Sequence, residues 1–105
     1  YKGNNMVKHV IIWTLKDTLS ESEKETVKKE AKCALEALAG NIEGLIDIKL
    51  NIDMLSSSNG EMMLDSTLES AEALATYQKH PLHVAAADTF VRPFASTRLC
   101  CDFEI

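Results

Sequence analysis

The sequence has few cysteines and no long apolar run. Its 105 residues include three cysteines, Cys33, Cys100 and Cys101. An odd number without regular spacing does not form a disulfide framework, and adjacent cysteines lack the C-x-x-C spacing of a redox dithiol. We therefore expect reduced thiols in a cytoplasmic protein. No apolar run approaches the roughly 20 residues of a membrane helix, and the first residues lack the apolar core of a signal peptide.

Positive charge is also scarce. Sixteen acidic residues outnumber eleven basic ones, which gives a net charge of −5. The basic residues do not cluster densely enough to follow a phosphate backbone, so nucleic acid is not an expected partner. A hydrophobic content of 46% is that of a globular chain. No linker or repeat interrupts the sequence, so we expect one domain over residues 6–105 after a polar leader at 1–5.

Periodic apolar residues predict four strands and two helical regions. The strands expected from alternation are residues 7–16, 45–54, 61–68 and 97–105. Ser20 and Glu23 form a capping box, which predicts a helix that runs to Gly40. Ser70 begins a second helical region, which is interrupted before Pro81 and restarts there. The order βαββαβ predicts an α+β, ferredoxin-like domain, with a four-stranded antiparallel sheet and its helices on one face.

The first strand is apolar on both of its faces. One face carries Val7, His9, Ile11, Trp13 and Leu15. The opposite face carries Val10 and Ile12, and a strand covered on only one side does not need this second apolar face. Because the helices suffice for one face of the sheet, we expect a second copy of the chain to cover the other and form a homodimer.

Two other elements have simpler patterns. In the second strand, the alternation predicts a half-buried strand near a sheet edge, with a buried face formed by Ile46, Ile48, Leu50 and Ile52. In the helix that begins at Ser70, the residues expected to point inward are Ala71, Leu74 and Ala75.

Candidate chemistry concentrates at residues 77–84, YQKHPLHV, which contain two of the three histidines. His83 falls in the first turn of the restarted helix, where the positive end of the dipole disfavours imidazolium and keeps a general base neutral. Tyr77 could donate a hydrogen bond to a developing oxyanion. The residues alone leave structural interpretations open: His80 as a helix cap, His9 as a core histidine and Tyr77 as ordinary packing.

A metal or other cofactor is not expected. His80 and His83 are three residues apart, but they would share a helix face only in a continuous helix, and Pro81 argues against one. No cysteine or carboxylate stands at a recognisable ligand spacing from them.

Two motifs resemble the Dabb family of stress-responsive dimeric A/B barrel proteins. They are the M-V-K-H that begins at Met6 and the H-P-x-H of residues 80–83, and they are followed by Asp88 and a closing C-D-F at 101–103. The resemblance implies a ferredoxin-like protomer and a dimer in which two four-stranded sheets form a barrel-like sandwich. Most members of the family have no assigned activity, and plant members are linked to stress responses.

One plant member of the family is a polyketide cyclase that acts by intramolecular aldol condensation. The resemblance to it implies that His83 is the catalytic base and Tyr77 its partner. The residues expected to bind substrate are His9, Ile11, Trp13, Leu64 and Phe94. This sequence differs from the cyclase, because Val-Ala-Ala-Ala follows His83 where the cyclase has a bulky aromatic residue, and Trp13 replaces a smaller residue.

Three functions remain open from the sequence. The first is small-molecule binding or processing, with cyclase-like or lyase-like acid–base chemistry. The second is a cofactor-independent, monooxygenase-like barrel that acts on an electron-rich aromatic compound. The third is a non-enzymatic dimeric module of the stress response. A cavity of a few hundred cubic ångströms bordered by Trp13, His9 and His83 would favour the first two, and a smaller one the third.

Overall fold

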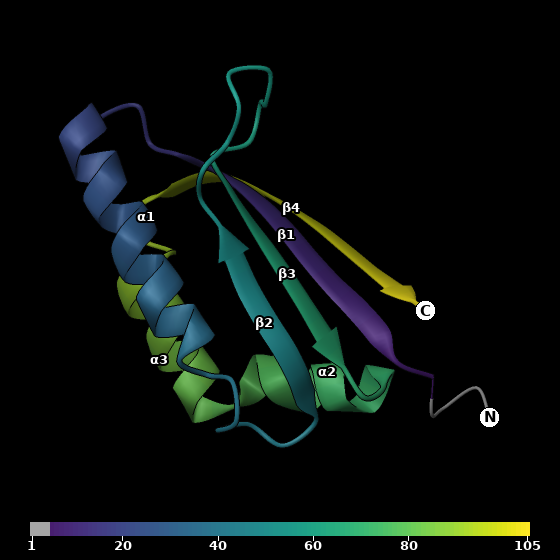
Figure 1. Cartoon of the computed structure of the whole chain (residues 1–105). Helices are drawn as coiled ribbons and strands as arrows, with labels where there is room; N and C mark the ends of the chain where they lie inside the picture. Colours follow the sequence, from purple (N-terminus) through teal and green to yellow (C-terminus); the bar gives the residue numbers. More distant parts are fainter. Residues whose placement is uncertain (1–4) are drawn as a thin grey trace.

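A computed structural model describes residues 5–105, which fold into a four-stranded antiparallel sheet with three helices on one face (Figure 1). The elements in chain order are β1 (Val7–Leu15), α1 (Glu21–Glu36), β2 (Leu45–Asn51), β3 (Met62–Leu68), α2 (Ala71–Lys79), α3 (Pro81–Phe90) and β4 (Ala95–Glu104). The ferredoxin-like βαββαβ order is confirmed, with its second helical region divided into α2 and α3. Of the polar leader expected at residues 1–5, residues 1–4 lie outside the described part.

The strands are ordered β2-β3-β1-β4, so β1 is central and β2 and β4 lie at the edges. Two cross-strand neighbours flank each residue of β1. His9 lies opposite Ser66 on β3 and Asp102 on β4, whereas Trp13 lies opposite Met62 and Arg98. This register brings the first strand beside residues that are almost a whole chain length away in sequence.

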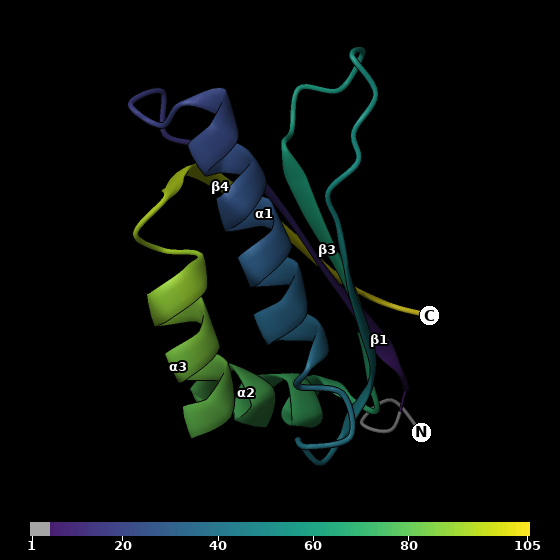
Figure 2. The ribbon, with the colours of Figure 1, turned by 60° about the vertical axis from the view of Figure 1, so that its left-hand side comes forward.

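The core lies between the sheet and the helices (Figure 2). The helix-facing residues of β1, from Val7 to Leu15, are all buried, and the residues between them are partly exposed. In α1 the capping box forms as predicted: the Ser20 hydroxyl accepts from the Glu23 backbone N–H at 3.1 Å, and the Ser20 N–H donates to the Glu23 carboxylate at 2.8 Å. The helix itself ends at Glu36, and turns continue to Gly40.

A bulge changes the predicted faces of β2. The pairing register shifts between Leu45 and Asp47, which turns Leu45 into the core and leaves Ile46 48% exposed. The expectation that Ile46 faces inward with Ile48 is therefore wrong, because simple alternation cannot anticipate an inserted residue.

The inward face of α2 also differs from the prediction. Leu74 and Tyr77 are buried, whereas Ala71 and Ala75 are exposed. The helix is rotated so that its two largest apolar side chains, rather than its alanines, enter the core. This rotation places Tyr77 beside β1. None of the helices in the described part of the chain combines the length and apolarity needed to cross a membrane.

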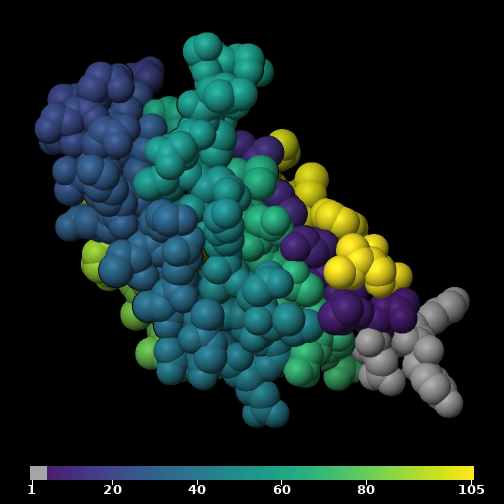
Figure 3. Space-filling view, in the orientation of Figure 1, coloured from purple at the N-terminus to yellow at the C-terminus, as the bar shows by residue number. Residues whose placement is uncertain are grey.

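The other face of the sheet carries no helix (Figure 2). Its apolar residues on the neighbouring strands are Val10, Ile12, Met63, Leu99 and Phe103. Leu99 is 63% exposed and Phe103 49%. In Figure 3, atoms of β4 are visible along one edge of the molecule, and the β2–β3 loop projects from its top. An apolar surface of this kind on a sheet marks an interaction site.

Two glycines after α1 provide a matched test of the packing between β2 and α2. Gly40 and Gly44 both have positive φ, 79° and 88°, but a Cβ on Gly44 would lie 2.8 Å from the Cβ of Ala73, whereas one on Gly40 would meet nothing within 4 Å. We expect Gly40→Ala to cost about 1–2 kcal/mol of unfolding free energy through backbone strain. Gly44→Ala should cost about 1–3 kcal/mol more through overpacking. Urea denaturation of the two variants would measure the difference, and equal losses would contradict the close packing at Ala73.

Candidate functional site

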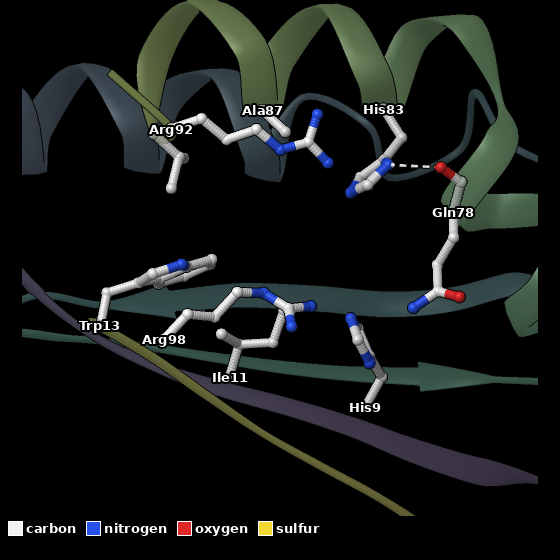
Figure 4. A pocket seen from close by; sticks show the side chains of 9 residues that line it. His9, Ile11, Trp13, Gln78, His83, Ala87, Arg92 and Arg98 are labelled. Atoms are coloured by element: carbon white, nitrogen blue, oxygen red, sulfur yellow. Dashed lines mark hydrogen bonds between the residues drawn. The ribbon is translucent and has the colours of Figure 1, made fainter. Parts of the chain in front are cut away.

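A cavity of about 170 Å³ lies between the sheet and α3 (Figure 4). The residues that line it are His9, Ile11, Trp13, Gln78, His83, Ala87, Val91, Arg92 and Arg98. Five of these residues are buried: His9, Ile11 and Trp13 lie on β1, Ala87 lies on α3, and Val91 directly follows α3. Gln78, Arg92 and Arg98 are exposed and form the rim of the cavity. The two histidines approach the cavity from opposite walls, His9 from the sheet and His83 from α3.

His83 has a defined hydrogen-bonding arrangement. Its Nδ1 lies 3.1 Å from the backbone carbonyl oxygen of Gln78. Because a carbonyl oxygen only accepts, Nδ1 carries the proton in neutral His83 and Nε2 keeps its lone pair. Figure 4 shows this second nitrogen pointing into the cavity.

Burial lowers the pKa of His83, against a smaller opposing effect of the hydrogen bond to Gln78. The positive charges of Arg92 and Arg98, and His9, lower this pKa further. His83 is therefore neutral at pH 7. The position of His83 in the first turn of the helix predicts a neutral imidazole through the helix dipole, whereas desolvation by burial is the main cause in the structure.

His9 is almost completely buried, with 1% of its surface exposed. Its Nδ1 lies 2.5 Å from the carboxylate of Asp102, its neighbour on β4. Since a carboxylate accepts, Nδ1 donates, and Nε2 is the ring nitrogen left to face the cavity. His9 is therefore a hydrogen-bonded core residue that also lines the cavity.

Tyr77 lies behind the histidines rather than in the cavity wall. Its ring is fully buried, 4.4 Å from the ring of His83 and 6.1 Å from that of His9, measured between centroids. Burial raises the pKa of Tyr77, so the phenol keeps its proton. Its hydroxyl has no hydrogen-bond partner among residues 5–105. The structure thus brings Tyr77, His83 and His9 together as expected, but Tyr77 does not border the cavity.

Comparison with known protein families places the chain in one of them. The model of the stress responsive A/B barrel domain, Dabb, matches residues 7–105. The chain belongs to the Dabb family. No functionally curated protein matches the sequence.

Solved structures agree with this membership. A dimeric Bacteroides fragilis protein of unknown function, with a ferredoxin-like fold, is 30% identical over 95% of this chain and 96% of its own, with a TM-score of 0.89. An Arabidopsis thaliana protein is 28% identical over 94% of both chains, with a TM-score of 0.71. A hydroxynitrile lyase from Passiflora edulis is 16% identical over 97% of this chain and 94% of its own, with a TM-score of 0.69, and this likeness concerns the fold alone.

Two residues expected to bind substrate lie outside the cavity of this Dabb protein. Leu64 is 1% exposed and is enclosed between its cross-strand neighbours Ile11 and Leu50. Phe94 faces a shallow groove beside α1, together with Val27. Neither side chain lines the cavity that His9 and His83 border.

The rim of the cavity carries residues that the sequence patterns did not indicate. Gln78, Arg92 and Arg98 were not identified as site residues. A signal existed for Arg98, because alternation along β4 places it on the same face as Asp102, which pairs with His9. Only the register between β1 and β4, which the sequence does not supply, places that face beside Trp13.

The Dabb domain holds one group of potential metal ligands within residues 5–105. Ligand atoms of His9, Cys100 and Asp102 lie within 4.8 Å of one another. However, the 2.5 Å contact between His9 Nδ1 and the Asp102 carboxylate is a hydrogen bond. Two nitrogen or oxygen ligands of a tetrahedral zinc ion would lie about 3.3 Å apart, given bonds of about 2.0–2.2 Å. The Cys100 thiol lies 3.4 Å from the same carboxylate. The group therefore orients His9, and we assign it no metal.

Proposed function

We propose that this Dabb protein binds a small carbonyl compound in the cavity and moves a proton at the carbon next to the carbonyl, with His83 as the base. The observation that carries the proposal is the arrangement of His83: its Nδ1 is held by the Gln78 carbonyl, and its free Nε2 points into the cavity. A general base must be neutral at the working pH and within reach of the proton it removes. The lowered pKa of His83 supports the first requirement.

Two neighbours support this role. The Asp102 carboxylate, 2.5 Å from His9, accepts the Nδ1 proton of His9 and fixes the ring so that Nε2 can accept a hydrogen bond from the bound molecule at the opposite wall, while the proton taken by His83 returns from His83 itself. Tyr77 packs against the His83 ring. We assign Tyr77 to positioning His83, because its buried hydroxyl lies outside the cavity wall and an oxyanion donor must reach the reacting oxygen.

The size of the cavity limits the substrate. About 170 Å³ holds about five or six water molecules, at ~30 Å³ each. This volume is below the roughly 300 Å³ at which small-molecule sites usually begin. A long linear polyketide therefore does not fit within one protomer. The same observation favours a second candidate, the non-enzymatic dimeric module, over a monooxygenase-like barrel that must admit an aromatic ring.

We also infer that the protein is a homodimer. The helix-free face of the sheet is apolar along β1 and β4, with Leu99 and Phe103 largely exposed in the single chain. The Bacteroides fragilis protein, 30% identical, is described as dimeric. A second copy packed face to face would bury this surface by the same symmetric contact on both protomers.

The cysteines support a reducing, cytoplasmic location. Cys33, Cys100 and Cys101 are all unpaired, and two of them are exposed. Cys100 and Cys101 are consecutive on β4, so their side chains point to opposite faces of the sheet and cannot bridge one another. Free exposed thiols persist where cellular reductants keep them reduced.

Deuterium exchange tests the proposed chemistry without knowledge of the natural substrate. In D₂O, the protein should accelerate exchange of the α-protons of a small ketone such as acetone, as followed by proton NMR. Because His83 acts as a base only when neutral, and because burial lowers its pKa, the protein-dependent rate should fall as the pH falls, with a midpoint below 6.5. The charged or titratable groups around His83 are Tyr77, His9, Arg92 and Arg98. Exchange no faster than that in buffer would contradict the proposal.

A further inference from the structure

The cavity differs in charge from the rest of the molecule. The chain has a net charge of −5. The cavity, in contrast, is lined by two arginines and by no aspartate or glutamate. Arg92 and Arg98 come from different elements, one directly after α3 and the other from β4. The fold therefore concentrates positive charge at the one place where two histidines also meet.

Arg98 extends over the cavity without a protein partner. Its Cα lies opposite that of Trp13 in the β1–β4 pairing, on the helix-facing side of the sheet. Within residues 5–105 its side chain is not among the ion pairs. In Figure 4 its guanidinium group points into the space between Trp13 and the histidines. A guanidinium in this position has N–H donors available for a ligand.

Arg92 approaches the same space from the helical wall (Figure 4). One of its terminal nitrogens, Nη1, pairs with the carboxylate of Asp88, one turn earlier on the chain. This contact holds the side chain and leaves the other donors of the guanidinium fork unused. Both arginines line the cavity that His83 borders, so their charge acts on the base as well as on a ligand.

We propose that the ligand of this cavity is a small organic carboxylate, anchored at the rim by Arg92 and Arg98. This inference rests on the proposed function in so far as the cavity must bind a ligand. The guanidinium fork matches the two oxygens of a carboxylate and prefers them to a neutral carbonyl. The buried apolar lining, which includes Ile11 and Trp13 on the sheet and Ala87 on the facing α3, suits the apolar body of the molecule. A carboxylate held at the rim would place the carbons next to it between His83 and His9.

Trp13 reports directly on this site. It is the single tryptophan of the chain and it lines the cavity, so its fluorescence monitors binding without a label. The probes are butyrate and its neutral counterpart butyramide, which have similar shapes and differ in charge. We expect butyrate to bind at least about tenfold more tightly than butyramide, because hydrogen bonds to a charged group are the stronger ones. Added salt should weaken the binding of butyrate but not that of butyramide.

Substitutions at the rim identify the residues responsible. Arg92→Gln and Arg98→Gln should each weaken butyrate binding about tenfold and leave butyramide binding unchanged. Lys29→Gln is the matched control, since Lys29 is exposed on α1 outside the cavity and its loss removes the same charge from the chain. Both arginines are exposed, so thermal melting should show intact folding of each variant.

The outcomes separate this inference from the proposed function. Equal affinities for butyrate and butyramide would overturn the carboxylate proposal and leave the cavity as a binding site. Binding of inorganic phosphate as tight as that of butyrate would also overturn it, because an apolar body would then contribute nothing. A Trp13 signal that responds to none of the three probes, together with ketone exchange no faster than that in buffer, would contradict both proposals.

Discussion

Replacing Leu99 with Asp is expected to convert the protein from a dimer to a monomer that remains folded. Leu99 is 63% exposed in the single chain, so a folded monomer tolerates a carboxylate there. In the proposed dimer the same residue is buried against the second sheet, where an unpaired charge costs about 3–5 kcal/mol. A loss of about 3 kcal/mol raises the dissociation constant more than a hundredfold. Sedimentation at micromolar concentration would therefore show the mass of a dimer for the natural sequence and of a monomer for the variant.

The control variant introduces the same negative charge on the helical layer, on the opposite side of the molecule from the proposed interface. Leu82 is 47% exposed in the first turn of α3, and Leu82→Asp should leave the dimer intact. An aspartate there is also compatible with the positive end of the helix dipole. Circular dichroism should report helical content close to that of the natural sequence for both variants. If Leu99→Asp sediments as a dimer, the helix-free face of the sheet is not the dimer interface.

The local elements of the fold were predictable from short-range patterns. The capping box at Ser20 and the proline at Pro81 each fix a helix start by local chemistry, and both starts are found in the structure. The two-sided apolar pattern of β1 correctly indicated a central strand. The inward rotation of Tyr77 and the exposure of Ile46 were not predictable, because they depend on tertiary packing and on a bulge.

The site was predictable only in part for the same reason. The H-P-x-H motif places His83 in the first turn of α3, where it borders the cavity. The partner of His9, in contrast, is 93 residues away in sequence, and only the register of β1 against β4 brings Asp102 to it. The rim arginines depend on the same register and on the end of α3. Long-range pairings of this kind leave no local signal in a single sequence.

Replacing His83 with Gln is expected to reduce the protein-dependent exchange of ketone α-protons at least about a hundredfold, the usual contribution of a positioned general base. The glutamine amide is neutral and of similar size, so the substitution adds no charge beside Arg92 and Arg98. It has no basic nitrogen, however, and cannot accept the proton. The variant should also lose the rate decrease below pH 6.5, because the group with the lowered pKa is absent.

His80→Asn is the matched control for this substitution. His80 is the N-cap of α3, where its Nδ1 accepts from the Leu82 N–H at 3.1 Å, and it does not line the cavity. Asparagine is a favourable N-cap, so this variant should keep both stability and the full exchange rate. Thermal melting, together with the exchange rate, distinguishes a role of His83 in proton transfer from a role in packing. If His83→Gln mainly lowers the melting temperature and retains the exchange rate, the histidine serves the packing against Tyr77 rather than proton transfer.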